Sequence, residues 1–386
     1  MVDFKQSFRK AHEKGISPAA SAHLDAIRGL AALTVLLSHA RHLLLKDWGH
    51  LRRHSLPLKL VYGTTEFGHQ AVIIFFILSG FLIGPGVLRG IHSGRWSSAR
   101  YFVHRFVRLE VVLLPALLLC AFWDLTGIHF FGLGWIYGGH ADFYPVGYDI
   151  AKRINVPVFF GNLGFLQTLR VPILGSDSAL WSLANEFWYY LLFPCIVLAC
   201  FSSRKIAARL AYGAAGLSIA WFVRGDILLY FPIWVIGAAV YYLPKSNHSV
   251  ATKRIFLAIS AALFGLDFLS TKQYWSNLLI SDLVLSCFFA LFLYCLLNQT
   301  TAVGLRYAKL SHGLASSSYT LYVVHLPLLV FVVVWLGKRW VPTPLHLLFV
   351  LGIMCGTWLY AYGIYYLFEA HTPKIRQWTE RKLKVS

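Results

Sequence analysis

Long uncharged apolar runs recur along the whole chain and constrain its fold more than any other feature of the sequence. Residues 111–120, 191–201 and 347–360 are examples. A bilayer core about 30 Å thick is crossed by roughly 20 predominantly apolar residues in a helix. Only 13% of the residues are charged, whereas a soluble domain carries about 25%. The runs therefore predict an all-α, multi-pass membrane protein, and the alternating ten-residue segments of a membrane β-barrel are absent from the sequence.

Charged stretches and clusters of Pro and Gly divide the apolar sequence into ten predicted spans. They are expected at about residues 24–45, 68–88, 107–126, 180–201, 206–223, 227–243, 255–270, 279–297, 319–336 and 346–368. The first run is too long, and too polar at its ends, to be a cleaved signal peptide, so we interpret it as a retained span. The six cysteines lie in apolar runs without C-x-x-C spacing, so we expect neither disulfides nor a metal site.

The distribution of Lys and Arg orients these spans. With a cytoplasmic N-terminus, the inside segments hold about twice as many Lys and Arg as the outside segments. We therefore expect a cytoplasmic basic segment at 1–23, a transmembrane domain at 24–368 and a cytoplasmic basic tail at 369–386. A loop at about 127–179, rich in Gly and aromatic residues, would pack as a cap on the outside. The net charge of +19 is explained by basic loops facing an anionic leaflet, so the lipid bilayer is an expected partner and nucleic acid is not.

Two ionisable residues in the first span are functional candidates, because such side chains are costly inside a membrane. Arg28 and His39 are eleven residues apart, which places them on one face of a helix about 16 Å apart along its axis. Arg28 could bind an anion that carries a reactive group toward His39. It could instead pair with Asp25 three residues away, or reach a lipid phosphate. His39 could perform chemistry or hydrogen-bond two helices together.

Arginines at the start of the third span form a second candidate site. Arg105 and Arg108 lie on successive turns, and guanidinium groups suit phosphates. Positive anchoring at the cytoplasmic surface is the alternative. In the fourth span, Glu186 needs a partner, and with His39 it could form a general-base pair. It could instead reach back to the mouth of its helix.

Two further features lie in spans two and nine. His325 precedes Pro327. It could have a functional role, or it could pack around a helix kink at the proline. The pair Ser79–Gly80 is typical of helices that approach each other closely, which makes it a packing feature on physical grounds.

Six motifs in order, across about residues 23–375, resemble the acyltransferase-3 family of membrane acyltransferases. They are L-D-x-x-R-G at 24–29 with His39 following, F-F-x-L-S-G-F-L-I at 75–83, R-x-x-R-L at 105–109, W-S-L-x-x-E at 181–186, S-Y-x-x-Y-x-x-H-x-P at 318–327 and E-x-x-x-P at 369–373. The chain departs from the family at Ala26, where Gly is usual. It also departs at Phe187, where many relatives carry a second acid, so Glu186 is the only carboxylate of its motif.

The resemblance implies transfer of an acyl group, usually acetyl, from cytoplasmic acyl-coenzyme A to a hydroxyl of a surface glycan or lipid-linked sugar. Acetyl-CoA would be a substrate, and no permanently bound cofactor is implied. The family pattern assigns Arg28, Arg105 and Arg108 to the coenzyme phosphates. It assigns His39 the role of general base or acyl carrier, assisted by Glu186. Other motif residues would line the same cavity: Asp25, Ser79, Trp181, Ser182, Tyr322 and His325. A bacterial inner membrane is the expected location.

Two other functions fit the same residues. An intramembrane set of His, Glu and Arg would also serve a proton-coupled transporter of a small anion. The absence of paired, Gly- or Pro-broken spans weighs against a transporter, and a transporter would not consume the thioester. A non-catalytic partner of a polysaccharide export machine would keep its function when His39 is replaced by alanine.

Overall fold

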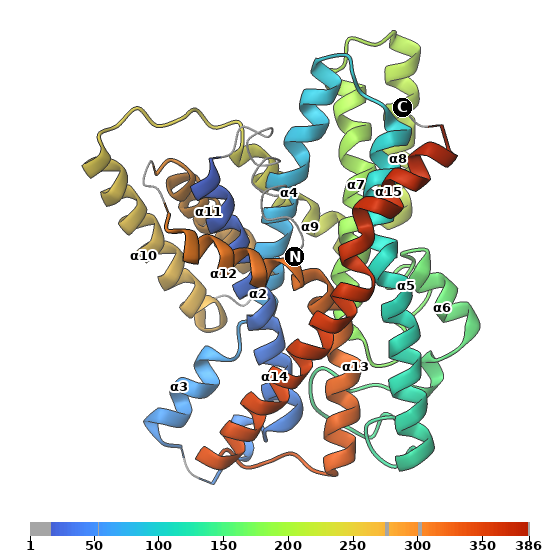
Figure 1. Ribbon diagram of the computed structural model, residues 1–386, viewed down its shortest axis with the longest axis vertical. Helices are drawn as coiled ribbons and strands as arrows, with labels where there is room; N and C mark the ends of the chain where they lie inside the picture. The colour runs from blue at the N-terminus through green and yellow to red at the C-terminus, as the bar shows by residue number, and fades with distance from the viewer. Residues whose placement is uncertain (1–16, 53, 275–277, 300–302, 385–386) are drawn as a thin grey trace. The chain divides into compact units, whose positions relative to one another are not determined.

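A computed structural model describes residues 17–384, with gaps at 53, 275–277 and 300–302. The described chain is helical (Figure 1), and its extended residues form isolated bridges rather than strands. The long helices are α2 (Pro18–Leu44), α4 (Gly68–His92), α5 (Ser98–Phe131), α7 (Trp181–Phe201), α8 (Ile206–Val223), α9 (Asp226–Val240), α10 (Val250–Tyr274), α11 (Leu278–Leu297), α13 (Ser318–Leu336) and α14 (Pro344–Leu367). Shorter helices are α3 (Leu56–Thr64), α6 (Val156–Leu163), α12 (Leu305–Ser316) and α15 (Thr372–Lys382).

The predicted all-α fold is confirmed, and each of the ten predicted spans overlaps one helix. In the described residues, eight stretches are long and apolar enough to cross a membrane. The predicted spans 227–243 and 255–270 are not among them. The first corresponds to α9, which has only 15 residues, and the second to α10, which carries Lys253, Arg254 and Asp267. The number of spans is therefore near the prediction, with eight supported by length and composition.

Helix boundaries differ most at the third predicted span. The helix α5 begins at Ser98 and ends at Phe131, whereas hydropathy placed the span at 107–126. Hydropathy detects only the most apolar stretch of a helix, whereas α5 begins among basic residues before that stretch and continues for five residues beyond it. The polar residues 98–106, including Arg105, are therefore helical rather than part of a loop.

The chain forms two compact units, which are described separately. The first unit comprises residues 1–31, 70–102 and 185–315, and the second comprises 32–69, 103–184 and 316–386. The helix α2, which contains both Arg28 and His39, contributes its first part to one unit and its second part to the other.

In the first unit, α4 and α9 approach each other so closely that side chains are excluded between them. A Cβ atom at Gly80 would overlap the carbonyl oxygen of Trp234, and one at Gly237 would overlap the carbonyl oxygen of Ile77. Gly84 similarly faces Ala238. Small residues at such a crossing allow backbones to meet in an apolar environment. The close approach predicted from Ser79–Gly80 is confirmed.

In the second unit, α13 is the central helix. Every residue from Thr320 to Pro327 is buried, and a helix that is apolar on all sides belongs in a core. It packs against α14. The predicted loop at 127–179 also contributes to this core, because Ile136, Val146 and Phe165 are fully buried.

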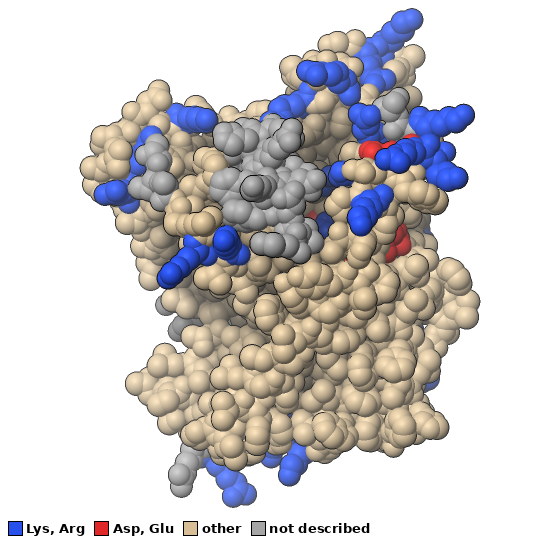
Figure 2. Space-filling view, in the orientation of Figure 1, with Lys and Arg blue, Asp and Glu red and all other residues tan. Residues whose placement is uncertain are grey.

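Exposed apolar residues cover much of the remaining helix surface. Leu210, Leu217 and Trp221 of α8 are each more than 60% exposed. Figure 2 shows a broad surface of uncharged residues, with Lys and Arg side chains gathered in groups apart from it. Such a surface is unfavourable in water and suits contact with lipid. The eight apolar stretches and this surface are those of an integral, multi-pass membrane protein.

Because α4 and α9 approach each other closely, two glycines of α4 should differ sharply in how much stability is lost when each is replaced by alanine. We expect Gly80→Ala to lower stability by about 1–3 kcal/mol, because its methyl group would push the two backbones apart. Gly86→Ala is the matched control, since a Cβ there meets no atom within 4 Å and alanine favours helix. Thermal unfolding in detergent measures both, and equal unfolding temperatures would contradict the proposed crossing.

Candidate active site

His39 lies in the second unit, and both of its ring nitrogens face other side chains. The side chain is buried, with 5% of the residue exposed. Its Nδ1 is 2.7 Å from Nε2 of His325, and its Nε2 is 3.2 Å from the hydroxyl of Tyr144. The two imidazole rings are stacked, with centroids 5.0 Å apart. His325 is therefore the direct partner of His39.

The carbonyl groups around His325 determine which nitrogen of His39 can act as a base. Nδ1 of His325 lies 2.9 Å from the carbonyl oxygen of Leu321 and 3.0 Å from that of Tyr322. Carbonyl oxygens only accept hydrogen bonds, so Nδ1 of His325 carries a proton and its Nε2 accepts when the ring is neutral. Nδ1 of His39 therefore donates to His325. In the neutral pair, the lone pair of His39 is on Nε2, the nitrogen that faces Tyr144.

A second set of contacts joins α13 to the start of α7. The hydroxyl of Tyr322 donates to the carbonyl oxygen of Ala179 at 2.9 Å and lies 2.6 Å from the hydroxyl of Ser182. The ring of Trp181 stacks on His69, with centroids 6.3 Å apart. Ser182 and Tyr322 are thus brought together within the second unit, and they hold the helix turn that precedes His325.

Arg108 is engaged in an ion pair rather than facing an open site. Its Nη1 donates to Oε1 of Glu369, while Thr320 donates to the other carboxylate oxygen through both its backbone N–H and its hydroxyl. Arg108 also lies over the ring of Tyr319 at 5.2 Å, and the Tyr319 hydroxyl donates to the carbonyl oxygen of Leu109. The motif residues Arg108 and Glu369 therefore connect α5, α13 and the turn after α14.

Glu186 has its own network in the first unit. Its Oε1 accepts hydrogen bonds from the hydroxyls of Ser79, at 2.7 Å, and Tyr190. Ser79 in turn accepts from Nε1 of Trp234 at 3.0 Å. Ser79 is thus a hydrogen-bonding residue as well as part of a close helix crossing. Glu186 and His39 belong to different units, so their predicted pairing stays a prediction.

Arg28 forms the ion pair with Asp25 that its spacing allowed. The two side chains are 3.2 Å apart, and Nη2 of Arg28 also donates to the carbonyl oxygen of Ala315 at the end of α12. A cation is favoured at a helix C-terminus. Asp25 also lies 3.4 Å from Nδ1 of His312. Coenzyme binding by Arg28, Arg105 and Arg108 stays a prediction.

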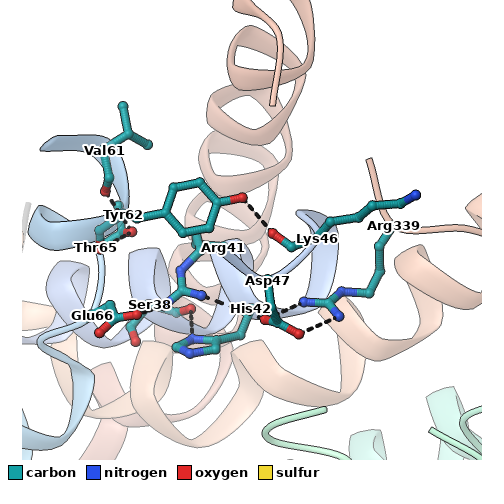
Figure 3. Close-up of polar contacts among 10 residues, drawn as sticks. All are labelled: Ser38, Arg41, His42, Lys46, Asp47, Val61, Tyr62, Thr65, Glu66 and Arg339. Atoms are coloured by element: carbon teal, nitrogen blue, oxygen red, sulfur yellow. Dashed lines mark hydrogen bonds and ion pairs between the residues drawn. The ribbon is translucent and has the colours of Figure 1, made fainter. Parts of the chain in front are cut away.

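Sequence reasoning missed a charged cluster that follows His39 (Figure 3). We define the charge clasp as Arg41, Asp47, Glu66 and Arg339. Buried Arg41 donates to Glu66 at 3.0 Å, and Arg339 donates through two nitrogens to Asp47 at 2.8 and 2.9 Å. Burial is the largest single effect on the pKa of Asp47 and raises it, but the hydrogen bonds and charge of Arg339, together with His42 and Arg41, lower the pKa overall. Arg41 was a visible signal, because a buried arginine two residues after His39 requires a carboxylate.

Tyr144 was also missed, and nothing in its sequence context points to it. It lies in an irregular loop without helical periodicity. Among the described residues, no three His, Cys, Asp or Glu side chains are grouped so that they could hold a metal ion. The six cysteines are free.

The ion pair of Glu369 predicts that this carboxylate is important for stability. We expect Glu369→Ala to lower stability by about 1–3 kcal/mol, because it leaves buried donors of Thr320 without an acceptor and removes the partner of Arg108. Glu380→Ala is the control, since its contact with His104 is more exposed and should contribute less than about 1 kcal/mol. Thermal unfolding in detergent compares the two. A larger loss for Glu380→Ala would contradict the assignment.

Comparison with known proteins is consistent with these motifs. The chain is 24% identical over 214 residues to an O-acetyl transferase of Shigella phage Sf6, and the match covers 55% of this chain and 56% of that protein. The chain thus matches about half the length of this curated relative. No solved structure matches it. The family model described as an acyltransferase domain matches residues 21–363, which is nearly the whole chain, and the protein therefore belongs to the acyltransferase-3 family.

Proposed function

We propose that this protein transfers an acyl group, most simply acetyl, from acyl-CoA to a hydroxyl of a glycan or lipid-linked sugar at a bacterial inner membrane. Membership of an acyltransferase family supports the reaction class, and the O-acetyl transferase relative favours acetyl and a hydroxyl acceptor. The observation that carries the proposal is the geometry of His39, which is buried and hydrogen-bonded through Nδ1, with its lone pair on Nε2.

In the proposed reaction, Nε2 of His39 removes the proton of the acceptor hydroxyl. The hydroxyl oxygen attacks the thioester carbonyl carbon, the C–S bond breaks, and the coenzyme thiolate leaves and takes the proton. General-base catalysis of this kind contributes about 10²–10⁴-fold to a rate. The same lone pair could attack the thioester first and form an acyl-imidazole. Both routes use Nε2, and both need Nδ1 held in place.

His325 takes the position that a carboxylate occupies in many catalytic triads, where a third group orients the imidazole. Its acceptor nitrogen fixes the tautomer and the orientation of His39. When His39 takes up a proton, the Nδ1–H group becomes a stronger donor to His325. Glu186 remains the proposed assisting carboxylate, and its contacts with Ser79 and Tyr190 keep it oriented in the first unit.

Arg28, Arg105 and Arg108 are the proposed ligands of the coenzyme phosphates. Arg28 is the best of the three to test, because its ion pair with Asp25 is a single contact. Phosphate and carboxylate oxygens both form charge-assisted hydrogen bonds with guanidinium groups, so a coenzyme would compete with Asp25. Arg108 is less suitable, since its substitution would also break the contact with Glu369.

The first test follows thiol release by the purified protein in detergent, with acetyl-CoA and a crude cell-envelope glycan extract. We expect glycan-stimulated release by the wild type, loss of at least about 10²-fold in His39→Ala, and a higher coenzyme requirement in Arg28→Ala. Equal release by His39→Ala and the wild type would contradict the mechanism. Background release by both would instead favour the transporter.

A second test addresses His325 as a positioning residue. We expect His325→Ala to lower the turnover number by about 10²-fold, since Nδ1 of His39 loses its acceptor. His325→Gln offers an amide oxygen to Nδ1–H and should restore part of the rate. The unfolding temperatures of both variants show whether a lower turnover number results from the lost hydrogen bond or from loss of structure. If Gln and Ala are equally inactive while both remain folded, the hydrogen bond is not the role of His325.

A further inference from the structure

Tyr144 contacts the one atom of His39 that the proposed reaction uses. Its hydroxyl lies 3.2 Å from Nε2, and its ring centroid is 5.7 Å from that of His39. It also packs edge-on against His42, with centroids 5.1 Å apart. Because the lone pair of His39 is on Nε2, the phenol donates and the imidazole accepts. A tyrosine hydroxyl ordinarily has a pKa of about 10, so the phenol keeps its proton at neutral pH.

The residues on both sides of Tyr144 are anchored in the second unit. Phe143 is buried and lies under the guanidinium of Arg339, 4.1 Å from its ring centroid. Arg339 is held by its two hydrogen bonds to Asp47 in the charge clasp (Figure 3). Val146 is fully buried. The loop therefore has a fixed attachment on each side of Tyr144.

Tyr144 itself is 57% exposed, although its hydroxyl points to a buried histidine. More than half of the residue is already exposed, so rotation of the side chain outward exposes little additional apolar area. A residue with one inward hydrogen bond and fixed neighbours can leave its position without unfolding the loop.

A hydroxyl group that donates to Nε2 is what the acceptor substrate must present there. Phenol and acceptor cannot both occupy the lone pair. We propose that the Tyr144 hydroxyl marks the acceptor-hydroxyl position and closes it until an acceptor displaces the side chain, an inference that rests on the proposed function. A closed position keeps water from the base, so the thioester is not hydrolysed in the absence of acceptor. The entering molecule passes the rings of Tyr144 and His42, which suits the apolar face of a sugar ring.

Removing the side chain should create a site for an added phenol. In Tyr144→Gly, phenol would donate its proton to Nε2 of His39, and its oxygen would attack the carbonyl carbon of acetyl-CoA. The C–S bond breaks, the coenzyme leaves as the thiol after taking the proton, and phenyl acetate is formed. The high exposure of Tyr144 indicates that its removal leaves the fold intact, and Tyr144→Ala provides a second variant.

The experiment gives acetyl-CoA to the purified full chain in detergent, with and without phenol, and measures thiol release and phenyl acetate. We expect Tyr144→Gly and Tyr144→Ala to hydrolyse acetyl-CoA several-fold faster than the wild type without acceptor, and to form phenyl acetate. The wild type should form none. Tyr148→Phe is the matched control, because it removes a phenol hydroxyl from the same loop that has no hydrogen-bond partner; it should behave as the wild type.

The His39→Ala/Tyr144→Gly double variant should lose both reactions, which shows that they use His39. The proposal is overturned if folded Tyr144→Gly and Tyr144→Ala hydrolyse acetyl-CoA at the wild-type rate and form no phenyl acetate, while the wild type shows glycan-stimulated release that depends on His39. Phenyl acetate formation that survives the loss of His39 would overturn it as well. Absence of His39-dependent thioester cleavage in every variant, with or without glycan extract, would instead remove the proposed function itself.

Discussion

A polar side chain inside an apolar helix bundle has no water to bind, so it must find its hydrogen-bond partner on another part of the chain. This requirement organises each unit of the protein. In the second unit it brings His39 to His325 and Ser182 to Tyr322. In the first unit it brings Ser79 to Glu186. Motifs that are far apart in the sequence therefore meet because each supplies the polar group that another one needs.

The pairing of two imidazoles has a chemical consequence that a histidine–carboxylate pair would not have. A carboxylate accepts from Nδ1 and also stabilises the positive charge that the base acquires. In the neutral pair, His325 donates through Nδ1 to the carbonyl oxygens of Leu321 and Tyr322 and accepts through Nε2, so it orients His39 without supplying a negative charge. If His39 is the base, its positive charge would need another stabilising group, and assistance by Glu186 stays a prediction.

The sequence predicted the helices well, but it did not predict which side chains contact each other between helices. Apolar runs of about 20 residues must be helical in a membrane, so every predicted span corresponds to a helix. The small residue at Gly80 likewise predicted a close crossing, because little else fits there. Helical spacing places a residue on a face but does not say which helix that face meets. For this reason His325 was known only as a candidate, and the pairing of Arg108 with Glu369 was not predicted. Tyr144 was not predicted as a site residue, because an irregular loop has no periodicity to interpret.

The sequence motifs and the loop at residues 132–155 contribute different contacts to the second unit. Arg108, Glu369 and Thr320 hold the start of α13, and α13 carries His325, the partner of His39. None of these residues comes from residues 132–155, where the chain follows no family pattern that we can identify. That loop contacts His39 through Tyr144, and Phe143 of the same loop packs against Arg339. If Tyr144 marks the acceptor site, acceptor preference can change through loop residues while the base keeps its geometry. An acyltransferase built in this way can retain one chemistry and take different hydroxyl acceptors.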